Sequence, residues 1–282
     1  MKPTPTKFAR LRHLGYVVDR KIDLAEAALL LASAERPGVA FEPYRRHLKR
    51  LTGDVGAYAE NAKPSAHHAD VLSLRSEALI QVVNRRYGYQ GDPDALEDME
   101  SANLMRVIDL RQGRPVALGI LYLHIARSLG WAAEALDFPI HFLIRLEHDG
   151  GRVILDPFDG GRKIEAQEMR HMIKAVSGNQ AELLPRHSMA LGNRAVLLRL
   201  QDHVKSRHLS AGRVADALDT LGAMLSVAPL ESPLWYESGL LHARLDHLEE
   251  AVVALEAYLS LGSGEQSRAS VLLQDLRARL SP

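Results

Sequence analysis

The first hundred residues place apolar side chains at helical spacing. Asp23-Leu-Ala-Glu26 is a capping-box sequence, in which the Asp side chain accepts hydrogen bonds from the first turn. The apolar positions that follow it predict a helix that stops at Pro37-Gly38. Two more helices are predicted, a short basic amphipathic one over Tyr44–Leu51 and another over Leu72–Tyr87. The N-terminal third is therefore expected to be helical.

The pattern changes in the middle third of the chain. An apolar run from Pro115 to Leu129 predicts a helix, with the proline in its first turn and Gly130 as its C-terminal cap. Strand-like runs follow at Ala132–Phe138, Ile140–Glu147 and Arg152–Leu155. The sequence His148-Asp-Gly-Gly151 is typical of a hairpin turn. Consecutive antiparallel strands after a helix predict an α+β domain with a small antiparallel sheet.

The last ninety residues contain a repeat. Ala251 and Leu255 follow Ala217 and Leu221 at an offset of 34 residues, which is the period of tetratricopeptide units. Small residues such as Gly239 allow two antiparallel helices to approach closely. The sequence therefore predicts tetratricopeptide-like helical hairpins, against the alternative of an ordinary helical bundle.

The repeat and the change of pattern together define the expected domains. The first unit of the repeat is degenerate, because Gln201 and Lys205 stand where Trp and Gly would be. A last helix over Glu265–Leu280 is expected to cap the stack. We expect an α+β domain over residues 1–187 and an all-α array of helical hairpins over residues 188–282.

Composition and charge restrict the possible partners. The 282 residues are 46% hydrophobic and 25% charged, with 35 basic residues against 35 acidic ones. This balance gives no general basic field for nucleic acid or for an anionic membrane. The N-terminal sequence has no apolar core of the signal-peptide kind, and the longest apolar stretch, Val116–Ala126, is too short to span a membrane. We expect a soluble cytoplasmic protein.

Cysteine and histidine usage narrows the chemistry. The sequence has no cysteine, which excludes disulfides, thiolate metal sites and a cysteine nucleophile. None of the thirteen histidines lies three or four residues from another, the spacing that places two imidazoles on one helix face. No phosphate-binding glycine loop is present. The sequence therefore predicts neither a metal nor a cofactor.

Two basic segments each allow two interpretations. One side of the predicted second helix is mostly basic, with Arg45, Arg46, Lys49 and Arg50. This side could bind a partner, or it could be a helix face that is simply exposed to solvent. Arg85-Arg86-Tyr87 could contact nucleic acid, or simply end a helix in solvent. The solvated interpretation is the simpler one for both.

Three segments in a fixed order resemble a known family. They are Asn103–Gly130, Phe138-Pro-Ile-His-Phe-Leu-Ile-Arg145 and Leu155-Asp-Pro-Phe-Asp-Gly-Gly161. In this order, and ahead of the helical repeats, they resemble the SirB1 family of bacterial transglutaminase-like proteins. The resemblance covers about residues 20 to 275. It departs from the family at Asp98-Met-Glu-Ser-Ala102, where family members carry Asp-Pro-x-Asn-Ser.

The resemblance implies a papain-like transglutaminase core with a cysteine, histidine and aspartate triad. Carried over by position, the histidine is His141 and the aspartate is Asp156. The cysteine position falls on Pro115, or on Val116 with a one-residue shift, and Ala117 follows. None of these three residues can attack a carbonyl. The implied catalytic triad has therefore lost its nucleophile, and no catalytic residue is expected.

These residues support one leading prediction and leave alternatives. We expect His141 and Asp156 to form a vestigial pair beside the helix that begins at Pro115, joined by a hydrogen bond or one water. The protein would then be a non-catalytic, regulatory or scaffolding module that binds a protein or peptide through its repeats. The groove residues would include Tyr236, Leu240, Ala243 and Arg244.

The alternatives keep the pair functional. The first is a hydrolase or acyltransferase in which His141 activates water or a non-cysteine nucleophile such as Ser101. The second is a ligand-binding pocket that uses the pair without catalysis.

Overall fold

The computed structural model describes residues 9–62, 68–93, 99–139, 141–262, 264 and 266–280. Asp98, Ile140 and Glu265, which begin segments discussed above, lie outside these ranges. The described chain forms two compact units, one over residues 23–196 and one that combines residues 9–22 with residues 197–280. The domain boundaries expected from the sequence stay a prediction, because a compact unit is not by itself an independently folding domain.

The first helix of the unit over residues 23–196 begins at the capping residue that the sequence predicts. Asp23 caps this helix, accepting hydrogen bonds from the backbone N–H groups of Ala25 and Glu26 at 3.0 Å each. The helices of this unit are α2 (Leu24–Glu35), α3 (Glu42–Asn61), α4 (His68–Leu79), α5 (Leu104–Leu110), α6 (Pro115–Ser128) and α7 (Ala166–Ser177). The described part of the unit also contains η2 (Ile80–Arg86), which continues α4 as a π-helix, η4 (Met99–Ala102) and η5 (Pro185–Ser188).

The second helix is much longer than expected. The sequence predicts eight residues over Tyr44–Leu51, whereas α3 has 20 residues. Its buried stripe continues from Leu48 and Leu51 to Val55, so the apolar contact carries the helix past Gly53. Packing overrides the low helix propensity of glycine here.

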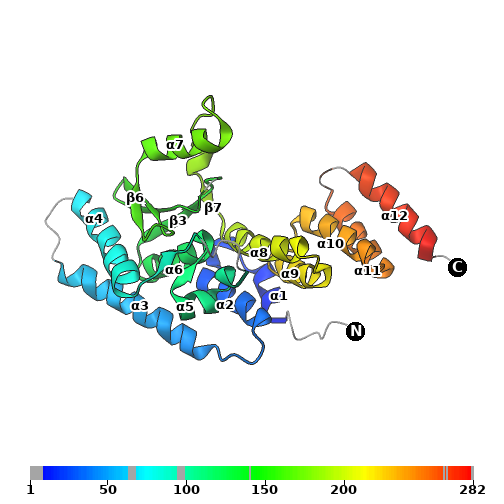
Figure 1. Ribbon diagram of the computed structural model, residues 1–282, viewed down its shortest axis with the longest axis horizontal. Helices are drawn as coiled ribbons and strands as arrows, with labels where there is room; N and C mark the ends of the chain where they lie inside the picture. The colour runs from blue at the N-terminus through cyan, green and yellow to red at the C-terminus, as the bar shows by residue number, and fades with distance from the viewer. Residues whose placement is uncertain are drawn as a thin grey trace. The chain divides into compact units, whose positions relative to one another are not determined.

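A five-stranded antiparallel sheet has the order β6-β5-β4-β3-β7. The strands are β3 (Ala132–Leu136), β4 (Ile144–His148), β5 (Gly151–Asp156), β6 (Arg162–Ile164) and β7 (Ala190–Leu191). The β4–β5 hairpin pairs His148 with Gly151, and Asp149 and Gly150 both adopt positive φ, as the expected turn requires. Helix α6 covers one face of the sheet and α7 the other (Figure 1).

The prediction of a strand over Ile140–Glu147 is wrong at its start. Strand β4 begins at Ile144, so His141 lies in the connection from β3 and not on the strand. Pro139 lacks a backbone N–H and cannot continue a ladder, which explains why the pairing begins later.

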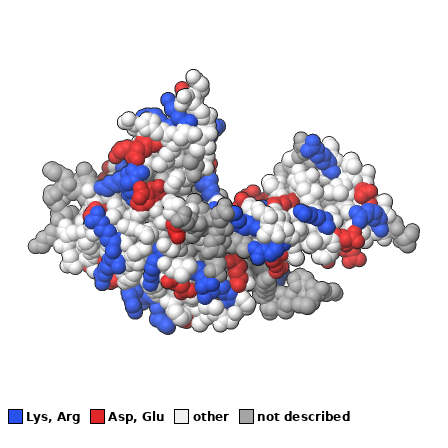
Figure 2. All heavy atoms as spheres, viewed as in Figure 1, with Lys and Arg blue, Asp and Glu red and all other residues white. Residues whose placement is uncertain are grey.

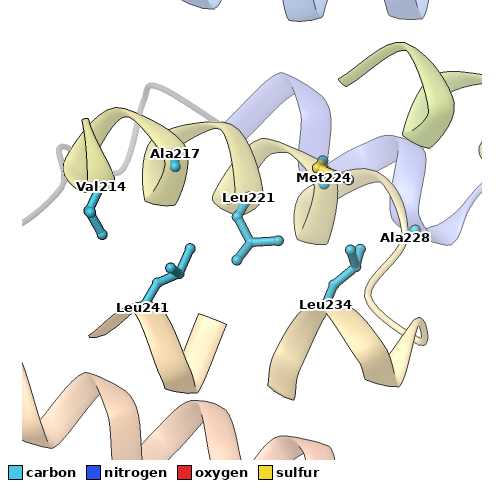
Figure 3. Close-up of a cluster of buried hydrophobic side chains, with 7 residues drawn as sticks. All are labelled: Val214, Ala217, Leu221, Met224, Ala228, Leu234 and Leu241. Atoms are coloured by element: carbon cyan, nitrogen blue, oxygen red, sulfur yellow. The ribbon is translucent and has the colours of Figure 1, made fainter. Parts of the chain in front are cut away.

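The unit formed by residues 9–22 and 197–280 is helical throughout its described part. Its elements are α1 (Ala9–Tyr16), η1 (Asp19–Lys21), α9 (Val214–Val227), α10 (Ser232–Arg244), α11 (Leu248–Ser260) and α12 (Gln266–Leu280), while α8 (Asn193–Ser210) enters it from residue 197. Side chains of α9 and α10 point toward one another and form a buried cluster (Figure 3). A second cluster joins α11 to α12. The C-terminal run of packed helices agrees with the expected all-α region.

Two contacts show how closely these helices pack. A Cβ atom on Gly239 of α10 would lie 2.7 Å from Leu255 Cγ of α11, which is too close for any real contact. A Cβ on Gly15 of α1 would lie 2.8 Å from the carbonyl oxygen of Ser226 in α9. The second contact was not expected, because it joins residues at opposite ends of the sequence.

None of the helices in the described ranges is both long enough and apolar enough to cross a membrane.

We expect the same substitution at two helical glycines to change stability in opposite directions. Gly239→Ala forces Leu255 away and should lower the free energy of unfolding by about 1–3 kcal/mol. Gly53→Ala in α3 meets no atom within 4 Å and should raise it by about 0.5–1 kcal/mol. Denaturant unfolding of both variants measures the difference. An unchanged midpoint for Gly239→Ala would contradict the close approach of α10 and α11.

Candidate functional site

The carboxylate of Asp156 is fixed at the end of β5. Asp156 is 2% exposed, and its Oδ1 accepts hydrogen bonds from the backbone N–H groups of Phe158, at 2.9 Å, and Asp159, at 3.3 Å. These bonds form a turn of the Asx type, which the sequence Asp-Pro-Phe-Asp-Gly-Gly favours. The turn ends at Gly160 and Gly161, which both have positive φ. Backbone hydrogen bonds therefore hold one oxygen, and the second oxygen is directed elsewhere.

That second oxygen faces His141. Nδ1 of His141 lies 3.2 Å from Oδ2 of Asp156, and the two side chains are 28% and 3% exposed. The contact is an ion pair when the imidazole is protonated. Asp156 raises the pKa of His141, and burial of the imidazole opposes this effect in part. The structure thus brings the two predicted residues together.

Phe158 connects this pair to the start of α6. Its ring meets the His141 ring edge-on at 6.0 Å, and its carbonyl accepts a hydrogen bond from the N–H of Gly91 at 2.9 Å. A side chain at Gly91 would collide with the Phe158 ring at 2.2 Å. Gly91 belongs to the two-residue strand β1 (Gln90–Gly91), which pairs in parallel with β2 (Gln112–Gly113) directly before α6.

The middle of α6 lies behind the same turn. Gly119 leaves room for Phe142, whose ring would be 2.1 Å from a Cβ at that position. The hydroxyl of Tyr122 is buried without a hydrogen-bond partner among the described residues, and a Cβ on Gly161 would lie 2.9 Å from it. Burial, with the negative charge of Asp156 in support, raises the pKa of Tyr122. Sequence reasoning did not single out Tyr122, which looked like one more core residue of an apolar helix.

The expected nucleophile position is closed and apolar. Pro115 occupies the first turn of α6, Val116 is 2% exposed and Ala117 is fully buried. Ser101, the alternative nucleophile, is 7% exposed, and its carbonyl accepts the backbone N–H of Arg114 at 2.9 Å. Pro115, Val116 and Ala117 therefore offer no group that could attack a carbonyl, and the hydroxyl-bearing Ser101 beside them is buried.

The four residues expected in the repeat groove divide into two pairs. Leu240 is 40% exposed and Arg244 is also exposed. Tyr236 and Ala243 are partly buried against the α11–α12 cluster, where the Tyr236 ring lies 5.1 Å from that of Tyr258. Only Leu240 and Arg244 are thus presented to solvent.

Within the described ranges, no group of three or more His, Asp or Glu side chains is arranged to hold a metal ion.

A match to a family model decides which family the chain belongs to. The model of the transglutaminase-like superfamily matches residues 42–202, which is more than half of the chain and includes both His141 and Asp156. The chain belongs to the transglutaminase-like superfamily.

This chain is similar to bacterial proteins of about the same length. A UPF0162 protein of Xylella fastidiosa strain Temecula1 is 27% identical over 252 residues, 88% of this chain and 87% of the relative. A UPF0162 protein of Vibrio cholerae is 29% identical over 209 residues, 74% of each chain. The UPF0162 protein YchA of Escherichia coli K12 is 25% identical over 241 residues, 84% of this chain and 85% of that protein.

The contact with Asp156 should be visible in the titration of His141. Because the pKa of His141 is raised by Asp156 and lowered by burial, Asp156→Asn should move it from above its ordinary value to below it. Nuclear magnetic resonance titration of the imidazole in both proteins measures this change. An unmoved titration curve would show that the carboxylate does not act on His141.

The same shift predicts the pH dependence of stability. A raised pKa in the folded state means that the pair stabilises the fold fully below the ordinary pKa of histidine, about 6.5, and that this stability is lost as the pH rises through the folded-state pKa. His141→Gln should therefore destabilise the protein more at acidic than at alkaline pH. Unfolding of both proteins at several pH values gives the comparison, and a pH-independent difference would contradict it.

Proposed function

We propose that this chain is a non-catalytic member of the transglutaminase-like superfamily that acts as a regulatory or scaffolding module and binds a protein partner. The observation that supports this most is the start of α6, where Val116 and Ala117 are buried apolar residues at the position of the nucleophile. In hydrolases with a triad, loss of the nucleophile removes nearly all of the chemical rate. The His141–Asp156 pair then serves to fix the β5–β6 turn and the connection before β4.

A hydrolase or acyltransferase in which His141 activates water or a non-cysteine nucleophile is the second candidate. The partial exposure of His141 beside a buried carboxylate supports it. The raised pKa of His141 is compatible with a general base, so it is the missing nucleophile at Val116 and Ala117 that argues against this candidate.

The partner surface is proposed on the C-terminal helices. The 34-residue offset and the close approach at Gly239 are both typical of tetratricopeptide units, whose helices offer a groove to peptides. Leu240 and Arg244, one turn apart on α10, supply an apolar and a cationic contact. The narrower resemblance to the SirB1 family, with a cytoplasmic bacterial setting, fits such a role and stays part of the proposal.

A surface substitution on α10 should abolish partner capture. We expect Leu240→Asp to remove partners that the wild-type protein retains from a lysate of its native cell, identified by mass spectrometry and confirmed with the purified partner. Val253→Asp is the matched control, because Val253 is a 61% exposed residue on the neighbouring helix α11. Equal loss in both variants, or in neither, would contradict the proposed surface.

A further inference from the structure

The unit over residues 23–196 also contains a cluster of positively charged side chains. This cluster does not include the His141–Asp156 pair. It lies where α3 packs against η2 and where β2 begins. Figure 2 shows Lys and Arg side chains along the edge of the molecule where Figure 1 places α3. Both basic segments that the sequence analysis left open contribute to it, Arg50 from the first and Arg86 from the second. Arg111 joins them from a third segment.

The backbone of Arg111 is held in an unusual conformation. Arg111 follows the last turn of α5 with φ 63° and ψ 12°, in the left-handed region that glycine normally occupies after a helix. The conformation is disfavoured for a residue with a Cβ atom by about 1–2 kcal/mol. Its N–H donates to the carbonyl of Val107 at 2.9 Å, and its carbonyl accepts from Gln90 at 3.1 Å. Glycine would adopt this conformation with less strain than arginine. The presence of an arginine here therefore favours a role for the arginine side chain.

In the part of the chain that the structure describes, the guanidinium of Arg111 contacts neutral groups. Its Nη1 lies 2.8 Å from Nε2 of His47 and also contacts the hydroxyl of the fully buried Tyr89. The guanidinium carbon lies 4.9 Å from the centre of the Tyr89 ring. Burial and the nearby positive charges lower the pKa of His47 to about 4, so His47 is neutral at pH 7. Among the described residues, no carboxylate lies within 4.0 Å of Arg111 to balance its charge.

A second arginine lies on the same helix face as His47. His47, Arg50 and Asp54 are spaced three and four residues apart on α3, so they form one stripe. Tyr87 lies against this stripe, since its hydroxyl donates to Oδ2 of Asp54 at 2.6 Å and its ring lies 5.7 Å from that of His47. Arg50 is exposed between them and influences the pKa values of both His47 and Tyr87.

The local charge balance is positive. Arg86 contacts Asp54 at 3.5 Å, with its guanidinium carbon 5.8 Å from the Tyr87 ring, and Arg111 lies 6.0 Å from the same ring. Asp54 is paired with Arg86, and Asp109, which also acts on Tyr89, is paired with Arg36. Among the described residues this leaves Arg50 and Arg111 as an excess charge of +2 beside the neutral His47. Arg111 is partly buried, whereas Arg50 is exposed. A partly buried charge without a counter-charge is unfavourable, and an anion bound to Arg111 and reached by Arg50 would relieve this.

We propose that Arg50 and Arg111, with Tyr87 beside them, bind the phosphate group of a small phosphorylated molecule. A phosphate monoester carries about −1.5 to −2 charges at pH 7, which matches the local excess. The planar fork of a guanidinium fits phosphate oxygens in pairs. A small ligand is favoured over nucleic acid, because the cluster is local and the chain as a whole has no net charge.

Titration of the full chain with inorganic phosphate and with pyrophosphate tests this site. Calorimetry or nuclear magnetic resonance at low salt should show saturable binding. Arg50→Gln and Arg111→Gln should each weaken it by about tenfold or more. Arg46→Gln is the matched control, since it removes the same charge from an exposed neighbouring position on α3 and should leave the affinity unchanged. Thermal unfolding of each variant establishes that it is folded.

Three results would overturn the proposal. They are the absence of saturable binding of either anion to the wild-type protein, equal affinity in the wild type and in Arg50→Gln, and binding of single-stranded RNA without binding of phosphate or pyrophosphate. Should Arg111→Gln fail to fold, Arg50→Gln decides the question alone. Arg50 is exposed and makes no hydrogen bond or ion pair in the part of the chain that the structure describes.

Discussion

The buried carboxylate of Asp156 is the constraint around which the α+β unit is arranged. Burying a charged group is unfavourable unless hydrogen bonds and opposite charge surround it. Here two backbone N–H groups satisfy one oxygen and the His141 imidazole faces the other. The same requirement sets the Gly160-Gly161 exit of the turn and the position of Phe158 over Gly91. A buried carboxylate that is held by backbone N–H groups and faces an imidazole would serve a catalytic triad. The same contacts would also hold a turn in one conformation.

The arrangement is incomplete in ways that matter for function. His141 and Asp156 lie within ion-pair distance, whereas Val116 and Ala117 place no nucleophile beside them. An imidazole that acts as a base is normally held in line by its carboxylate, which fixes its tautomer. The pair keeps the carboxylate's part of that arrangement, and the start of α6 lacks the nucleophile at Val116. Both suit a site that has kept its framework without its chemistry.

The sequence predicts what depends on neighbouring residues and misses what depends on distant ones. The cap at Asp23, helix α6 and the β4–β5 turn follow local signals and were predicted. Strands β1, β2, β6 and β7 have two or three residues each, too few to show a periodic pattern. The meeting of His141 with Asp156 could be predicted because a family resemblance supplied both positions. The meeting of His47, Tyr89 and Arg111 could not, because three separate segments supply them and only the folded chain brings them together.

The central claim is that the framework of His141 and Asp156 persists without catalysis. The most direct measurement is turnover of generic amide and ester substrates by the purified wild-type protein, compared with His141→Ala. We predict that both proteins show only background hydrolysis and no transamidation. Turnover by the wild type that disappears in His141→Ala, with the fold intact by circular dichroism, would contradict the claim.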